Sequence, residues 1–139
     1  MRIVIVSVAA APRLKADHVK ALANALAKGM AHDGHIVDVI NANESDGARL
    51  PGYDYVAIVT ETLSFFSARL PDAVKKILDS ARALGGKKGA AFVRKGGFRF
   101  NRALAVLMNA MEKEGMVVNW SDILLSVAHA EAMGKRIGA

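Results

Sequence analysis

The sequence contains no cysteine. This absence excludes disulfide bonds, thiolate nucleophiles, iron–sulfur clusters and every zinc site that is built from thiolates. The histidines do not replace such ligands, because no metal-ligand spacing relates them; they are His18, His32, His35 and His129. We therefore expect no metal site, while the lack of cysteine by itself leaves the cellular compartment open.

The motifs of several enzyme classes are missing as well. No serine lies in a G-x-S-x-G turn, so a hydrolase triad has no support. Neither the G-x-G-x-x-G fingerprint nor a Walker sequence occurs, which disfavours dinucleotide-binding and P-loop NTPase functions. Acidic residues such as Asp54, Glu61 and Asp72 are present, but a general acid and a general base must converge in space, which a sequence does not show. We assign no catalytic residue.

Long apolar runs are also absent. A membrane-spanning helix needs about 20 apolar residues, and the longest run stops at Pro12, Arg13 and Lys15. The opening residues fit a first strand better than a signal peptide, because alternating β-branched residues are followed at once by a helical pattern. We expect an unprocessed, cytoplasmic protein that does not cross a membrane.

What is present indicates one globular domain. The chain has 139 residues, of which 53% are hydrophobic and 23% are charged. This is enough for one core, too short for two ordinary domains, and too apolar for a disordered chain. We expect a single domain over residues 1–139. The formal net charge of +6 fits either an anionic partner or a solubilising surface.

Strand and helix patterns alternate along the chain. Apolar runs rich in Val and Ile predict strands at residues 2–9, 35–40, 53–60, 87–93 and 116–120. Apolar residues three or four apart predict helices that start at 17, 70, about 101 and about 122, and residues 41–52 are expected to form a loop. Because parallel strands need connections of helix length, this alternation predicts an α/β fold, a three-layer sandwich.

Five such units fit a five-stranded parallel sheet of order 2-1-3-4-5. In this order the winding reverses between the first and third strands, and a ligand crevice opens beside their carboxyl ends. The loops after the first, third and fourth strands are therefore the places where function is expected.

Three segments resemble the flavodoxin family: KALANALAKGMAHDGHIVDVI, LPDAVKKILDSARALGGKKGAAFV and AVLMNAMEKEGM. The most characteristic piece is GGKKGAAFV at the fourth strand, followed by Gly96 and Gly97. The resemblance covers nearly the whole chain and implies a flavodoxin-like fold, FMN as cofactor and a role in electron transfer. It indicates an electron carrier or binding protein more than a catalyst, since the redox chemistry would belong to the flavin.

The family holds the FMN phosphate in a loop of pattern Ser/Thr-x-Ser/Thr-Gly-x-Ser/Thr. At these positions this chain has Leu14, Lys15, Ala16, Asp17, His18 and Val19. Each missing hydrogen bond to phosphate is worth about 1.5–3 kcal/mol, and the Asp17 carboxylate competes for the positive end of the helix dipole. The resemblance therefore implies weak or altered FMN binding. Arg13 and Lys15 either compensate by gripping the phosphate or are solvated loop charges.

In the family, the loop after the third strand often reads Thr-Pro-Thr-Tyr and lies along the flavin ring. This chain has Thr60, Glu61, Thr62 and Leu63 there, so glutamate replaces proline and leucine replaces the aromatic residue. Phe65 and Phe66 follow, and they either cover a flavin face or pack against the third predicted helix. After the fourth strand, Lys95 precedes the pair Gly96 and Gly97, whose small size lets backbone N–H groups approach a ring edge.

Basic residues gather in loops at the same edge of the predicted sheet: Arg13, Lys15, Arg69, Arg94, Lys95, Arg99 and Arg102. A focused positive field favours an anionic ligand or an acidic redox partner. Two functions stay open: FMN-associated electron transfer, and a flavin-free binding module for another anionic ligand or acidic partner. Phe98 and Phe100, interleaved with arginines, also resemble a small patch for single-stranded nucleic acid, which is the weaker alternative.

Overall fold

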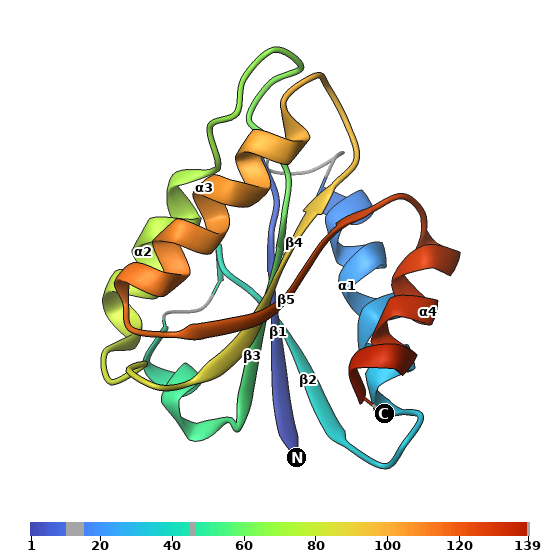
Figure 1. The fold of residues 1–139 in the computed structure, drawn as a ribbon, viewed down its shortest axis with the longest axis vertical. Helices are drawn as coiled ribbons and strands as arrows, with labels where there is room; N and C mark the ends of the chain where they lie inside the picture. Colours follow the sequence, from blue (N-terminus) through green and yellow to red (C-terminus); the bar gives the residue numbers. More distant parts are fainter. Residues whose placement is uncertain (11–15, 45–46, 139) are drawn as a thin grey trace.

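The computed structural model describes residues 1–10, 16–44 and 47–138, which form three layers (Figure 1). The strands are β1 (Arg2–Val8), β2 (Ile36–Asn41), β3 (Tyr55–Thr60), β4 (Lys88–Arg94) and β5 (Val117–Leu124). The helices are α1 (Ala16–Ala31), α2 (Asp72–Ala81), α3 (Phe100–Lys113) and α4 (Val127–Gly138). Within the described part, the strands form one sheet of order β2-β1-β3-β4-β5, and all its neighbours are parallel. The predicted fold class and strand order are confirmed.

The central strands are the most apolar ones. In β1 every residue after Arg2 is buried, and all residues of β3 are buried. Parallel strands covered by helices on both faces need such continuous apolar runs, because neither face meets water. This burial fixes β1 and β3 at the centre of the sheet, where the order of the strands reverses.

Helices α1 and α4 cover one face of the sheet, on the right in Figure 1. Val19, Leu26 and Met30 of α1 are fully buried against this face. Gly29 and Gly134 let the two helices approach closely, since a Cβ added at Gly29 would lie 2.1 Å from the Glu131 carbonyl oxygen. The pairing of α4 with α1 therefore depends on the absence of side chains at these positions.

Helices α2 and α3 cover the opposite face. Ile77 and Leu78 of α2 are almost fully buried, and so are Leu107 and Met111 of α3. With Val74 and Ala81 of α2 and Ala103 of α3, they give each helix one apolar stripe of three- and four-residue spacing toward the sheet. None of the described helices has the length and apolarity needed to span a membrane.

Element boundaries differ from the sequence predictions near the carboxyl end. Strand β5 continues to Leu124 rather than ending at Trp120, and α4 begins at Val127 rather than near residue 122. Ser121 and Leu124 pair with Ala91 and Arg94 of β4. The predicted helix start was wrong because Leu124 lies three residues before Val127, a spacing that suits a helix although its backbone continues the sheet.

Two smaller boundaries also differ. Residues Gly47–Gly52 form a short 3-10 helix inside the segment that was expected to be a loop. Helix α2 ends at Ala81, because Arg82 and Ala83 take positive φ angles of 44° and 53°. The sequence pattern predicts that this helix runs on to Gly85, because Leu84 continues its apolar spacing; Leu84 is buried although it lies beyond the helix.

Candidate functional site

The parallel register brings the loops predicted to be functional to one edge of the sheet. Val8 of β1 pairs with Thr60 of β3, Thr60 pairs with Val93 of β4, and Val93 pairs with Ile123 of β5. The connections after β3 and β4 both extend beyond this edge, at the top of Figure 1. We call this side of the sheet the carboxyl edge. It is the side at which the strand order predicts a ligand, because the winding of the sheet reverses between β1 and β3.

Part of the predicted phosphate loop lies outside the described residues. This applies to Arg13 and Lys15, and to the side chains of Ala16 and Asp17, which open α1. His18 is exposed on α1, whereas Val19 is fully buried in the core. Of the predicted phosphate-loop side chains, only those of His18 and Val19 are therefore placed, and only His18 reaches solvent.

Glu61 joins the ends of three strands. Its side chain is only 8% exposed. One carboxylate oxygen accepts a hydrogen bond of 2.9 Å from the backbone N–H of Ala10, just after β1. The other oxygen lies 3.6 Å from Nη1 of Arg94, the last residue of β4. The glutamate that replaces the family's proline therefore brings a buried negative charge to the loop after β1.

The two threonines beside Glu61 use their hydroxyls inside the protein. Thr60 is fully buried, and its Oγ1 donates a hydrogen bond of 2.9 Å to the Val8 carbonyl. Oγ1 of Thr62 donates to the Ser64 carbonyl at 3.1 Å. Both hydroxyl protons thus have acceptors within the protein and are engaged in holding the loop after β3.

The loops after β3 and β4 are attached to each other. The backbone N–H of Phe98 donates a hydrogen bond of 3.0 Å to the Phe65 carbonyl. Gly97, which precedes it, has a φ of +69°, and a Cβ there would lie 2.4 Å from the same carbonyl oxygen. A glycine is needed here for both the positive φ and the close approach.

Replacing Gly97 by alanine should therefore lower the free energy of unfolding by about 1–3 kcal/mol, through backbone strain and the clash with Phe65. Gly96→Ala is the matched control, because a Cβ at Gly96 would meet only the flexible end of Arg94, at 3.8 Å. Urea unfolding of both variants measures the difference. Equal stability of the two variants would show that the loops are not in contact.

Three phenylalanine rings from the two attached loops cluster together. Phe65 lies 4.8 Å from Phe98 and 5.4 Å from Phe66, measured between ring centroids. Phe65, Phe66 and Phe98 are nevertheless 57%, 74% and 70% exposed as residues. These rings are therefore not part of the buried core, although Phe66 lines a cavity with Arg102 and Val106 of α3.

The basic residues of the edge fall into two groups. Arg94 is paired with Glu61. Arg69, Arg99 and Arg102 instead surround an open cavity of about 540 Å³, together with Ser64, Phe66, Ser67, Ala68 and Val106. We call this cavity the arginine pocket. No acidic side chain lines it, and within the described residues these three guanidinium groups form no ion pair.

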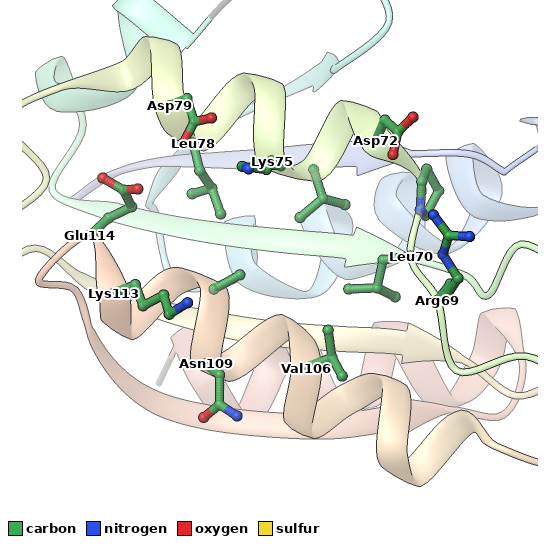
Figure 2. A pocket seen from close by; sticks show the side chains of 13 residues that line it. Arg69, Leu70, Asp72, Lys75, Leu78, Asp79, Val106, Asn109, Lys113 and Glu114 are labelled. Atoms are coloured by element: carbon green, nitrogen blue, oxygen red, sulfur yellow. The ribbon is translucent and has the colours of Figure 1, made fainter.

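A second cavity, of about 510 Å³, lies between α2 and α3 (Figure 2). Leu70, Val74 and Leu78 contribute apolar side chains to it, while Asp79 and Glu114 lie at the end away from Arg69. Arg69 and Val106 line both cavities. The arginine pocket therefore lies beside the groove between α2 and α3, on that face of the sheet.

Lys95, the remaining predicted site residue with a charge, is exposed, and its backbone N–H donates a hydrogen bond of 3.0 Å to the Leu124 carbonyl. Leu63 is 43% exposed and lines a third cavity with Ala9 and Ala10.

Among the described residues, no group of three or more histidine or acidic side chains is arranged to hold a metal ion. The chemistry that this edge offers is anion binding and aromatic contact.

Among the described residues, groups near the expected cofactor position already have hydrogen-bond partners within the protein. The Ala10 N–H, which opens the loop after β1, already has a carboxylate acceptor. A phosphate placed beside it would be repelled by the charge of Glu61. The Thr60 hydroxyl is committed to a carbonyl, and the flanking loops are hydrogen-bonded to each other. Within the described residues, the Ala10 N–H and the Thr60 hydroxyl are therefore occupied by the protein itself.

Comparisons with known proteins give structural matches only. Neither the models of known protein families nor the curated protein sequences contain a match to this chain. Its structure is similar to that of a flavodoxin from the domain Archaea, at 20% identity and a TM-score of 0.74, covering 99% of this chain and 96% of that one. Oxidised flavodoxin 1 from Bacillus cereus matches at 20% identity and a TM-score of 0.72, covering 96% and 95%.

A flavodoxin from Streptococcus pneumonia TIGR4 matches at 18% identity and a TM-score of 0.72, with all of both chains covered. Identities this low show the architecture and leave the ligand open. The strand order and these full-length similarities together establish that this chain has the flavodoxin-like fold.

Proposed function

We propose that the protein is a flavin-free binding module that captures an anionic ligand or acidic partner at its carboxyl edge. The observation that carries this proposal is the position of Glu61, which supplies an internal carboxylate to the Ala10 N–H and to Arg94. The Glu61 carboxylate would thereby offset part of the positive charge that attracts a cofactor phosphate. The anion-binding capacity that remains lies in the arginine pocket.

The electrostatics of the arginine pocket support the same proposal. Three guanidinium groups around one cavity repel one another, and no carboxylate among the lining residues offsets that repulsion. A bound anion would relieve it, and guanidinium groups bind phosphate or carboxylate oxygens through paired hydrogen bonds. The described edge is therefore better suited to bind a new anion than to hold the FMN phosphate.

FMN-associated electron transfer, with FMN bound weakly or by altered contacts, is the second candidate. It is favoured by the similarity of the whole chain to flavodoxins, one of which was solved in its oxidised state. In that case Arg13 and Lys15 would bind the phosphate, Gly96 and Gly97 would approach the ring, and cationic loops would raise the flavin potential. An acidic redox partner would then dock at the same edge.

Absorption spectra of the purified protein, before and after addition of FMN and removal of the excess, separate the two candidates. We expect no flavin band to stay with the protein once the excess FMN has been removed. A retained band that is lost on replacing both Arg13 and Lys15 by alanine would contradict the flavin-free proposal and support electron transfer.

A further inference from the structure

We infer that the arginine pocket is a nucleotide site, in which the arginines hold a phosphate and Phe66 stacks on the base. This inference rests on the proposed function, because it names the class of anion that the carboxyl edge takes. It is drawn from side chains of the loop after β3 and of the start of α3, not from the phosphate loop that the resemblance implies. The ligand chemistry is a phosphate ester linked to a flat ring.

The phosphate half of the site is defined by charge. Arg69 comes from the loop after β3, Arg99 directly precedes α3, and Arg102 lies in its first turn. These three residues are exposed and have no acidic partner within the described part of the chain. Their guanidinium groups can share the oxygens of one phosphate, which carries about two negative charges at neutral pH.

Hydroxyl groups add neutral hydrogen-bonding capacity. Ser64 and Ser67 line the same cavity. The Oγ of Ser67 accepts a hydrogen bond of 2.9 Å from the backbone N–H of Arg69, and no acceptor among the described residues takes its hydroxyl proton, which a ligand oxygen could therefore accept. A ligand with sugar or phosphate oxygens suits this lining better than a purely apolar one.

The ring half of the site is defined by Phe66. Its side chain is 74% exposed, yet the ring is braced by Phe65 at 5.4 Å and by Phe98 at 5.6 Å. An aromatic ring held by its neighbours and open to solvent is a ready surface for a planar ligand, and stacking on it needs little further ordering. Cavities of 300–1,000 Å³ are typical of small-ligand sites, a range that includes this pocket of about 540 Å³.

The attachment of the two loops is what assembles both halves. Arg69 and Phe66 belong to the loop after β3, whereas Arg99 and Arg102 follow β4. The hydrogen bond between Phe98 and Phe65 joins these segments. Phosphate and base are therefore recognised by residues that are brought together by the fold before any ligand arrives.

Isothermal titration with adenosine 5′-monophosphate, ribose 5-phosphate and adenosine tests the inference. Stacking of one base contributes about 1–3 kcal/mol, so the nucleotide should bind at least fivefold more tightly than the sugar phosphate. Arg102→Gln should weaken both phosphate ligands about tenfold. Phe66→Leu should weaken only the nucleotide, to the level of ribose 5-phosphate.

Lys20→Gln is the matched control for charge, because Lys20 is exposed on α1, on the opposite face of the sheet. Phe66 and Arg102 are themselves exposed, so their replacement leaves the core intact. If adenosine 5′-monophosphate and ribose 5-phosphate bind equally and Phe66→Leu changes neither, the nucleotide inference is overturned while anion binding stands. If no phosphate ligand binds, or Lys20→Gln weakens binding as much as Arg102→Gln, the proposed anion site falls as well.

A single-stranded oligoadenylate distinguishes the two sources of this ligand chemistry. Equal affinity for the mononucleotide and the strand identifies a free nucleotide as the ligand. Much tighter binding of the strand, still reduced by Phe66→Leu and by Arg102→Gln, identifies single-stranded nucleic acid. Strand binding that neither variant reduces would be general attraction to a basic protein, and it would overturn the inference.

Discussion

Replacing Gly134 by alanine should lower the free energy of unfolding by about 2–3 kcal/mol. A Cβ at Gly134 would lie 2.3 Å from the Leu26 carbonyl oxygen and 3.0 Å from the Met30 backbone nitrogen, both in the facing helix α1. Backbone atoms cannot rotate away, so α4 would have to move off α1. Alanine favours a helix over glycine by about 1 kcal/mol, which reduces the loss without reversing it.

Gly52→Ala is the control for this prediction, because nothing lies within 4 Å of a Cβ at Gly52 and its φ is not positive. Guanidinium unfolding of the two variants beside the parent protein gives the comparison. A Gly134→Ala variant as stable as Gly52→Ala would mean that α1 and α4 do not make this close contact in solution.

The second large effect concerns Glu61. Glu61→Gln should keep an acceptor for the Ala10 N–H while it removes the negative charge beside the loop after β1. Loss of that repulsion should raise the affinity for FMN about tenfold, equivalent to about 1.4 kcal/mol. Glu61→Ala removes the acceptor too, and it should in addition lower the free energy of unfolding by about 1–3 kcal/mol.

Fluorescence titration with FMN compares Glu61→Gln with Glu44→Gln. Glu44 is an exposed carboxylate that lines the cavity containing Ala9 and Ala10, so its variant removes the same charge near the same edge. We expect a much smaller gain for Glu44→Gln. Equal gains would mean that overall charge, rather than the buried carboxylate, opposes the cofactor.

Much of the fold follows from local sequence patterns. The apolar runs of β1 and β3 predict central strands, because a strand buried on both faces consists almost entirely of apolar residues. The edge strand β5 is different: exposed and partly buried residues alternate from Val117 to Asp122, and only Ile123 and Leu124 are buried. A weakly apolar edge strand has no equally clear signal, and its last residues were assigned to a helix.

The candidate site could be predicted only in outline. Topology places the loops after β3 and β4 at one edge, so the basic residues were expected to lie near one another. The partner of Glu61 is a backbone N–H that lies 51 residues earlier in the chain, and no side-chain pattern marks it. The same is true of the Phe98 to Phe65 hydrogen bond, whose sequence signal is limited to the glycine at position 97.

The sequence also does not indicate which arginines of this edge pair with an acidic side chain. Arg94 and Arg99 lie five residues apart in one basic segment, yet the first is paired with Glu61 and the second lines an open pocket. The difference arises because Arg94 still belongs to β4, whereas Arg99 lies beyond the turn at Gly97 and precedes α3.

The direct connection between the loops after β3 and β4 also affects the thermodynamics of ligand capture. The conformational entropy of these segments is lost when the chain folds, because a backbone hydrogen bond and a ring cluster already restrict them. A ligand that enters the arginine pocket then has little backbone left to order, so less of its interaction energy is spent on ordering the protein. The carboxyl edge is in this sense preorganised, and selectivity among anions would come from shape and charge rather than from loop closure.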